Sequence, residues 1–149
     1  MELSNLLYLA PVCGVIALIY AFLTSGWIGK QDAGTDRMKG IADQIARGAM
    51  AFLTAEYKVL GIFVLVVAAI LAFTVGKQPD SSPLVALSFV LGAFCSGLAG
   101  FFGMRVATKA NVRTAAEARK GLPGALKVAF RGGAVMGMSV VGLALLGLG

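Results

Sequence analysis

Histidine is absent from this 149-residue chain, and charged residues are scarce. Only 13% of the residues are charged and 58% are hydrophobic, whereas soluble domains carry roughly 25% charged and about 45–50% apolar residues. Because such a chain cannot cover its surface with polar groups, the composition predicts an integral membrane protein. The lack of histidine and of any Cys-x-x-Cys pair excludes a His/Cys metal site. We interpret Cys13 and Cys95, which lie within apolar runs, as small hydrophobic residues.

Charge is also missing from four long runs, at residues 3–29, 59–76, 81–104 and 132–149. Each run is close to the length of about 20 residues that a membrane helix needs. The first is not expected to be a signal peptide, because Glu2 precedes it and its apolar part is too long. We therefore expect an all-α membrane protein with one membrane domain, 1–149, and four transmembrane helices at about 4–29, 38–76, 82–119 and 123–149.

The basic residues are unevenly shared among the three connections between these runs. Five lie in the first connection, one in the second and seven in the third, so the first and third together hold twelve against one. Lys and Arg accumulate on the cytoplasmic side of membrane proteins. Both ends of the chain are therefore expected outside the cytoplasm, in a multi-pass protein of the cell (inner) membrane. No nucleic-acid partner is expected.

Two patterns predict how the helices pack. Small residues recur four apart at Gly92, Ser96 and Gly100, and again in the fourth run at Gly133 and Gly137, a spacing that favours close helix association in membranes. In the first connection, apolar residues recur at helical spacing, which predicts an amphipathic helix that runs into the second apolar run. These residues are Met38, Ile41, Ile45, Ala49 and Phe52. We favour packing of this helix on its neighbours over the alternative, an independent binding element.

Groups that carry catalysis are missing as well. No acid lies within the four runs, which excludes the rotor proteolipid of a rotary ATPase, because that rotor needs a carboxylate inside the membrane. No Ser or Thr has a histidine to act as its base. Mg²⁺-assisted phosphoryl chemistry needs several convergent carboxylates, and only Glu117 is near the basic third connection. We predict no catalytic, substrate-binding or metal-binding residue in this chain, which should not catalyse alone.

The third connection, "GMRVATKANVRTAAEARKGL", carries a basic stripe. Arg105, Lys109, Arg113 and Glu117 are four residues apart on an expected continuation of the third helix, which should end where Gly121, Pro123 and Gly124 follow. One interpretation is that these cations extend to the membrane interface and meet anionic lipid headgroups. The other is a basic funnel that attracts a polyphosphate anion.

Two longer stretches resemble a known family. "GFFGMRVATKANVRTAAEARKGLPGALKVAFRGGAVMG" and "IADQIARGAMAFLTAEYKVL" are similar to the third-to-fourth and second helix regions of membrane-integral, ion-translocating pyrophosphatases. The resemblance covers essentially the whole chain, but only the first quarter or less of the family's roughly sixteen-helix subunit. It implies an N-terminal fragment from the outer ring of helices.

The same resemblance implies a function for the full-length protein. It would be a homodimeric pump that hydrolyses pyrophosphate with Mg²⁺ and exports H⁺ or Na⁺, with its catalytic residues on later helices outside this chain. The resemblance leaves the choice of ion and any K⁺ requirement open. The alternative is a non-enzymatic four-helix membrane scaffold or interaction protein.

Overall fold

The computed structural model describes residues 3–75 and 84–148, which form four helices. They are α1 (Leu3–Gly29), α2 (Asp36–Val75), α3 (Leu84–Ala118) and α4 (Leu122–Leu148). The expected all-α fold with four long apolar helices is confirmed. The expected helix ends at 76, 82 and 149 lie outside the described residues.

Two helix starts differ slightly from the sequence-based expectation. α2 begins before residue 38 because the hydroxyl of Thr35 accepts a hydrogen bond of 3.4 Å from the backbone N–H of Met38, which caps the helix. We expected Pro123 and Gly124 to help end the preceding helix, but both lie in the first turn of α4, where proline is tolerated. The break is confined to the turn before α4, in which Gly121 has a φ of +149°.

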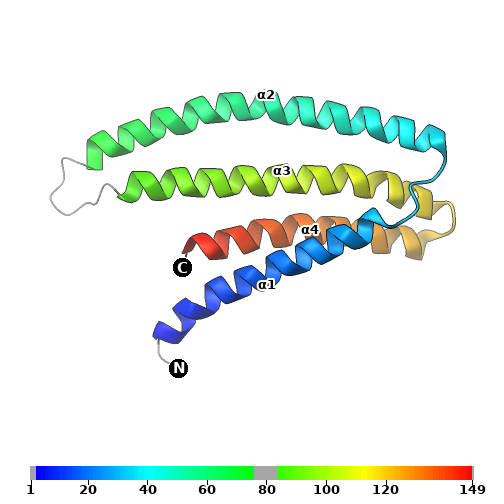
Figure 1. Cartoon of the computed structure of the whole chain (residues 1–149), viewed down its shortest axis with the longest axis horizontal. Coiled ribbons are helices and arrows are strands. Elements are labelled where there is room, and N and C mark those ends of the chain that lie inside the picture. Colours follow the sequence, from blue (N-terminus) through cyan, green and yellow to red (C-terminus); the bar gives the residue numbers. More distant parts are fainter. Residues whose placement is uncertain (1–2, 76–83, 149) are drawn as a thin grey trace.

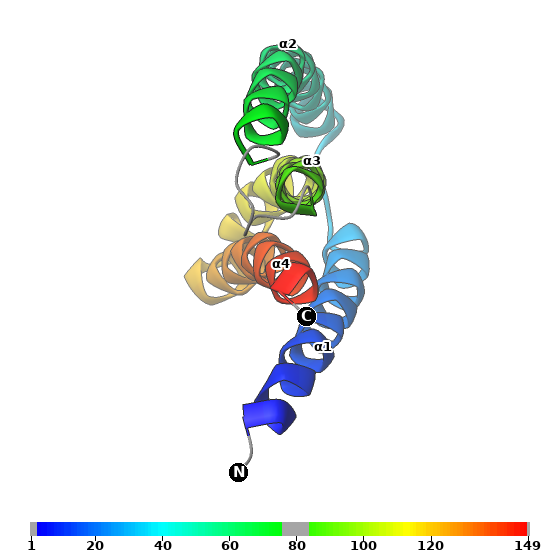
Figure 2. The same cartoon turned by 90° about the vertical axis from the view of Figure 1, so that its left-hand side faces the viewer.

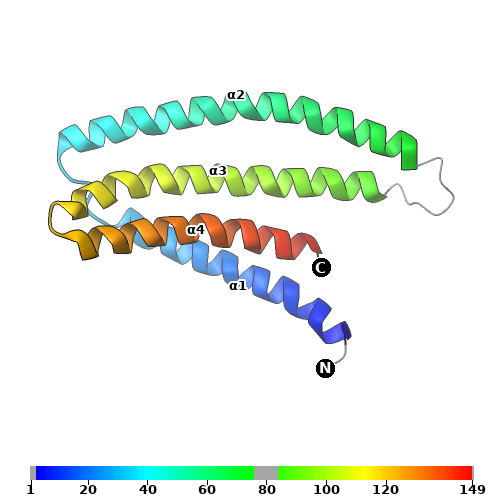
Figure 3. The ribbon, with the colours of Figure 1, turned by 180° about the vertical axis from the view of Figure 1, so that it is seen from behind.

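The helices run alternately in opposite directions (Figures 1 and 3). Viewed from the end, they are stacked in the order α2, α3, α4, α1 (Figure 2). Among the described helices, α2 contacts only α3, whereas α4 packs against both α3 and α1. The connections 30–35 and 119–121 lie at the same end of the molecule, opposite the start of α1 and the end of α4 (Figure 1). We call this the charged end.

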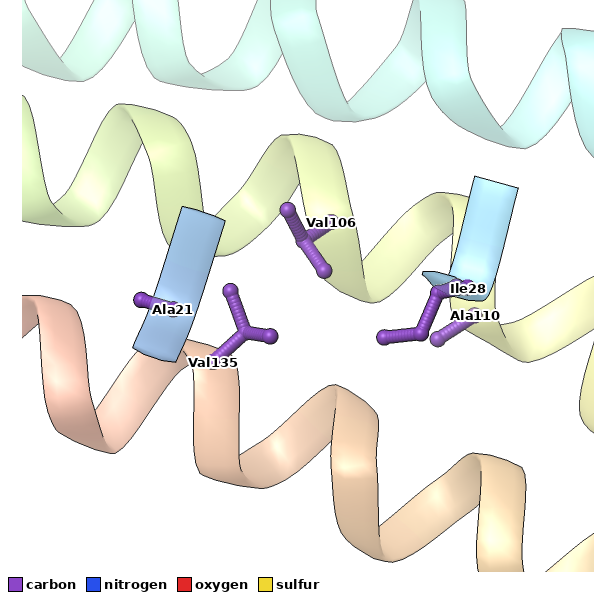
Figure 4. Packing of buried hydrophobic residues seen from close by; sticks show 5 residues of the cluster. All are labelled: Ala21, Ile28, Val106, Ala110 and Val135. Carbon is purple, nitrogen blue, oxygen red and sulfur yellow. The ribbon is translucent and has the colours of Figure 1, made fainter. Parts of the chain in front are cut away.

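The buried core is small and lies where α1, α3 and α4 meet (Figure 4). Its members are Ala21, Ile28, Val106, Ala110 and Val135. Large apolar side chains mostly face outward instead; Phe22 is 80% exposed and Phe130 is 74% exposed. Such exposure is costly in water but not in lipid, whose tails are as apolar as these side chains. All four helices are long and apolar enough to cross a membrane, and the chain is a multi-pass membrane protein.

The closest contacts between helices lie at glycines, but most of these are not the glycines that the sequence pattern marked. A Cβ atom at Gly14 of α1 would lie 2.8 Å from the carbonyl oxygen of Gly142 in α4. One at Gly132 of α4 would lie 2.8 Å from Cβ of Ala110 in α3. Of the predicted small residues, Gly100 approaches the hydroxyl of Tyr57, whereas Gly92, Gly133 and Gly137 have no such neighbour within 4 Å among the described residues. α1 and α4 therefore touch backbone to backbone.

The first half of α2 packs through a different face from the one predicted. Ile41, Ile45 and Phe52 are more than half exposed, while Leu53 is buried against α3. Further along, the hydroxyl of Tyr57 donates a 2.6 Å hydrogen bond to the carbonyl oxygen of Gly97. Packing was expected on the apolar stripe, but small side chains and Tyr57 allow closer contact with α3. Met38 and Ala49 of the predicted stripe are half-buried, whereas Ile41, Ile45 and Phe52 remain uncovered by the described part of this chain.

Candidate functional site: the charged end of the bundle

Most of the charged side chains lie at the charged end, where α1 ends, α2 begins, α3 ends and α4 begins (Figure 1). This placement follows from the sequence, because the twelve basic residues of the first and third connections flank these helix ends. Three local arrangements make up the site. They are the contacts of Arg113, a carboxylate pair around Lys120, and two cations against Trp27.

Arg113 caps the end of α1. Its Nε donates a hydrogen bond of 3.2 Å to the carbonyl of Gln31, and its Nη2 donates one of 3.2 Å to the carbonyl of Gly29. Its Nη1 donates to the carbonyl of Lys109 in its own helix, at 2.9 Å. The last carbonyls of a helix lack partners within the helix and carry partial negative charge, so a guanidinium there satisfies both hydrogen bonding and charge. Arg113 therefore ties α1 to α3.

This geometry gives the basic stripe local partners. Arg113 is half-buried and donates to backbone carbonyls, while both interpretations of the stripe, contact with lipid headgroups and attraction of a polyphosphate, stay predictions. Arg105 lies with its guanidinium carbon 5.7 Å from the ring centroid of Phe101. Glu117, the acid of the stripe, pairs with Lys120 at 2.8 Å. Three of the four side chains of the stripe, Arg105, Arg113 and Glu117, thus have separate local partners.

A second link joins the 30–35 connection to the turn before α4. Lys120 Nζ lies 3.6 Å from Asp32 Oδ2 and 2.8 Å from Glu117 Oε1. Asp32 Oδ1 accepts a 2.8 Å hydrogen bond from the N–H of Gly34, whose φ of +78° suits glycine. This hydrogen bond, with Lys120, lowers the pKa of Asp32, and the hydrogen bond to Glu117 raises the pKa of Lys120. Asp32 and Lys120 therefore stay charged over a wider pH range.

The third arrangement was not predicted. The guanidinium carbon of Arg131 lies 3.9 Å from the ring centroid of Trp27, and Lys127 Nζ lies 5.8 Å from it. Trp27 also packs against the buried core. A sequence signal was available, since Arg131 is the last charge before the charge-free run of α4 and tryptophan is enriched at membrane interfaces. The pairing itself depends on the packing of α1 on α4, which the sequence does not specify.

The charged end has no cluster suited to a metal ion within the described ranges 3–75 and 84–148. Asp36 and Asp43 are occupied in local pairs, with Lys39 at 3.1 Å and with Arg47 at 3.0 Å. The prediction that this chain holds no catalytic, substrate-binding or metal-binding residue stays a prediction. What the site can do chemically is bind helix ends together and present cations to an anion.

A groove of about 500 Å³ runs between α3 and α4 near the charged end. Its walls are mostly small side chains, together with one amide and one hydroxyl. They are Ala107, Ala110, Asn111, Thr114, Ala115, Ala118, Ala129, Gly132, Gly133 and Met136. Small walls of this kind allow another helix to approach closely, but they offer no acid–base pair.

Comparison with known proteins finds similarity along nearly the whole chain. Residues 15–149 match the family model described as "Inorganic H+ pyrophosphatase". A Clostridium tetani protein named "Putative K(+)-stimulated pyrophosphate-energized sodium pump" is 52% identical over 136 residues, which are 91% of this chain and 19% of that protein.

Two other relatives are named as proton pumps. A "K(+)-insensitive pyrophosphate-energized proton pump" of Methanosarcina mazei is 40% identical over 97% of this chain and 21% of its own length. A "K(+)-insensitive pyrophosphate-energized proton pump 2" of Moorella thermoacetica is 44% identical over 93% of this chain and 20% of its own length. The chain thus spans about a fifth of the length of the curated relatives it matches.

Proposed function

Because this chain belongs to the family of membrane-bound, proton- or sodium-pumping inorganic pyrophosphatases, we propose that it is the N-terminal, outer-ring part of a pyrophosphate-energised pump. The complete protein would hydrolyse pyrophosphate and export H⁺ or Na⁺ across the cell membrane. The observation that carries this proposal is the family match over residues 15–149. Both ions remain candidates, because the similar proteins carry names of both kinds.

The proposed role within the pump is structural. Acidic, basic and histidine side chains inside a membrane segment are the usual mark of an ion path, and the charge-free runs of these four helices contain none of them. Outward-facing side chains such as Phe22 and Phe130 suit helices that border lipid. These properties support a place in an outer ring of helices, where the segment would enclose catalytic helices supplied by the remaining four-fifths of the polypeptide.

Mg²⁺ is the cofactor expected of such a pump, but the described residues of this chain do not fit it. A Mg²⁺ ion requires converging oxygen ligands, and no group of three carboxylates or thiols is placed to hold one within residues 3–75 and 84–148. The metal and the pyrophosphate would therefore bind to later parts of the polypeptide. A homodimer is also proposed for the complete pump.

A segment exchange tests the proposal. The matching 136 residues of the Clostridium tetani relative would be replaced by the corresponding residues of this chain. The chimera should insert into membranes and release phosphate from pyrophosphate, with ion uptake into vesicles. A control chimera would carry the same segment with Gly14 and Gly142 both changed to Leu, which blocks the contact of α1 with α4. If the first chimera inserts but hydrolyses no pyrophosphate, while the unaltered relative does, the proposed role is contradicted.

A further inference from the structure

The pair of cations on Trp27 has hydrogen-bonding capacity that the described protein does not use. A guanidinium has five N–H donors and an ammonium has three. Within residues 3–75 and 84–148, neither Arg131 nor Lys127 has a hydrogen bond or an ion pair, and their recorded partner is the Trp27 ring. The nearby acids Asp32 and Glu117 are instead engaged by Lys120. Two positive charges are thus held side by side without an anion.

Packing fixes the position of this pair. Trp27 packs against the buried core of α1, α3 and α4, so its ring is a firm support for the guanidinium. Arg131 is half-buried, which limits its freedom, whereas Lys127 is exposed one turn earlier on the same helix. A ligand that orders two long side chains must offset their loss of conformational entropy. Because the Trp27 ring already orders Arg131, this entropy cost of binding is smaller.

The pair also lies at the depth of the membrane surface. Arg131 is the last charged residue before the charge-free run of α4, and Trp27 precedes Lys30, the first charged residue after the run of α1. Tryptophan is enriched at this level, where its ring meets the lipid headgroups. The most abundant anions at this level of the membrane are therefore the phosphate groups of the lipids.

Apolar side chains beside the pair suit acyl chains rather than a soluble anion. Leu23, one turn before Trp27 on α1, is 65% exposed, and Ile19, one turn before Leu23, is 54% exposed. We propose that Trp27, Lys127 and Arg131 form a binding site for the phosphate headgroup of an anionic phospholipid, whose acyl chains lie along this apolar surface. The ligand is a structural lipid on the outer surface of the bundle, where α1 and α4 meet, and its binding is separate from the pumping of ions.

The only tryptophan of the 149-residue sequence is Trp27, which gives a direct test. The chain is reconstituted in vesicles that contain either brominated phosphatidylglycerol or brominated phosphatidylcholine, since bromine quenches tryptophan on contact. Brominated phosphatidylglycerol should quench Trp27 at a several-fold lower mole fraction. Because one Lys or Arg changes attraction to an anionic surface by about fivefold, Lys127→Gln should lower this preference by up to that factor. Arg131→Lys should retain most of it.

Arg105→Gln is the control, because it removes one charge from a side chain that also lies against an aromatic ring but belongs to α3. It should leave the preference unchanged. The preference is the ratio of the mole fractions of brominated phosphatidylcholine and brominated phosphatidylglycerol that give equal quenching. A ratio close to one in the parent chain, or an equal fall of this ratio in Lys127→Gln and Arg105→Gln, would overturn the proposal. A second arm adds inorganic phosphate at constant ionic strength to vesicles of phosphatidylcholine alone. A saturable change of Trp27 fluorescence that Lys127→Gln abolishes would assign the site to soluble phosphate and overturn the lipid as its ligand.

Discussion

Arg113 joins segments that lie far apart in the sequence. Its guanidinium contacts the carbonyls of Gly29 and Gln31, 84 and 82 positions earlier in the chain. A lysine in its place would keep the charge but could not hold carbonyls of two segments with a planar fork. The residue therefore fixes the direction in which the chain leaves α1.

Replacement of Arg113 by Ala should destabilise the bundle by about 1–2 kcal/mol, because it removes a cation from a helix C-terminus and leaves the carbonyls of Gly29 and half-buried Gln31 without this donor. Thermal unfolding in mild detergent, followed by circular dichroism, measures the change. Arg119→Ala is the control, since Arg119 is exposed, and it should stay within about 0.5 kcal/mol of the parent chain. Equal effects of the two substitutions would show that Arg113 acts only through its charge.

The Asp32–Lys120 link should make stability depend on pH at both extremes. The pKa of Asp32 is lowered by its hydrogen bond from Gly34 and by Lys120, so its contribution is present above its unfolded pKa and is lost as pH falls through the lower folded value. The pKa of Lys120 is raised, so its contribution is present below its unfolded pKa and is lost as pH rises through the higher folded value. Both side chains are exposed, and the effects should be small.

Melting temperatures of the parent chain and of Asp32→Asn, recorded across the acid range, measure the first effect. The difference between the two proteins should be constant near neutral pH and should shrink as the pH falls below 3.8, the ordinary pKa of an aspartate. Asp43→Asn is a control, because Asp43 pairs only within α2. A difference for Asp32→Asn that grows on acidification would contradict the assignment.

At the scale of the helices, glycine decides which faces touch. The spacing of small residues marked Gly92, Ser96 and Gly100 on α3 and Gly133 and Gly137 on α4, yet the backbone contact in this structure is between Gly14 and Gly142. A helix rich in small residues offers several possible close faces. The spacing shows that close packing is feasible but does not name the partner helix.

Gly14→Ala should weaken the contact of α1 with α4 by about 1–3 kcal/mol, because its Cβ would meet the carbonyl oxygen of Gly142 at 2.8 Å and backbone cannot move aside cheaply. Gly133→Ala is matched in chemistry but has no neighbour within 4 Å among the described residues. It should be neutral or slightly stabilising, since alanine favours helix by about 1 kcal/mol over glycine. Unfolding in detergent compares the two, and similar losses would contradict the close contact.

The sequence predicted the elements better than their contacts. The charge-free runs and the helical spacing placed all four helices, because membrane insertion depends on local hydrophobicity along the chain. The hydrogen bonds of Arg113 were not predicted, because its partners at Gly29 and Gln31 become close only after α1 packs beside α3. Likewise, Trp27 and Arg131 are brought together by tertiary packing, and no spacing within either segment reveals it.

α2 is the element that extends furthest beyond a membrane. Its 40 residues correspond to about 60 Å at 1.5 Å per residue, roughly twice the hydrocarbon thickness of a bilayer. The charge-free part begins at Val59, so the preceding turns, with Ile41, Ile45 and Phe52 exposed, lie outside the hydrocarbon. In the proposed pump this apolar stripe would pack against other parts of the polypeptide.

For the whole molecule, the distribution of basic residues predicts the orientation in the membrane. Twelve of the thirteen Lys and Arg residues lie in the first and third connections, so these should face the cytoplasm. In a chain with Cys13 and Cys95 replaced by Ala, single cysteines at Lys39, Ser82 and Arg119 report the sides. An impermeant thiol reagent added outside intact cells should label the cysteine at position 82 only. Labelling of the cysteines at positions 39 and 119, and not of the one at position 82, would show that the chain has the opposite orientation.

The same molecule should hydrolyse no pyrophosphate when purified alone. Pyrophosphate at neutral pH carries several negative charges and reacts as a metal complex, so its cleavage needs carboxylates that hold Mg²⁺ and orient a water molecule. At the charged end, Glu117 and Asp32 share Lys120, and Asp36 and Asp43 pair within α2. The basic residues could attract the anion, but attraction without a metal site and a base leaves the reaction barrier unchanged. Phosphate release from the purified chain with Mg²⁺ should equal that of a buffer blank. Release above the blank that Glu117→Gln abolishes would show that this segment contributes to the chemistry, and the outer-ring role would have to be abandoned.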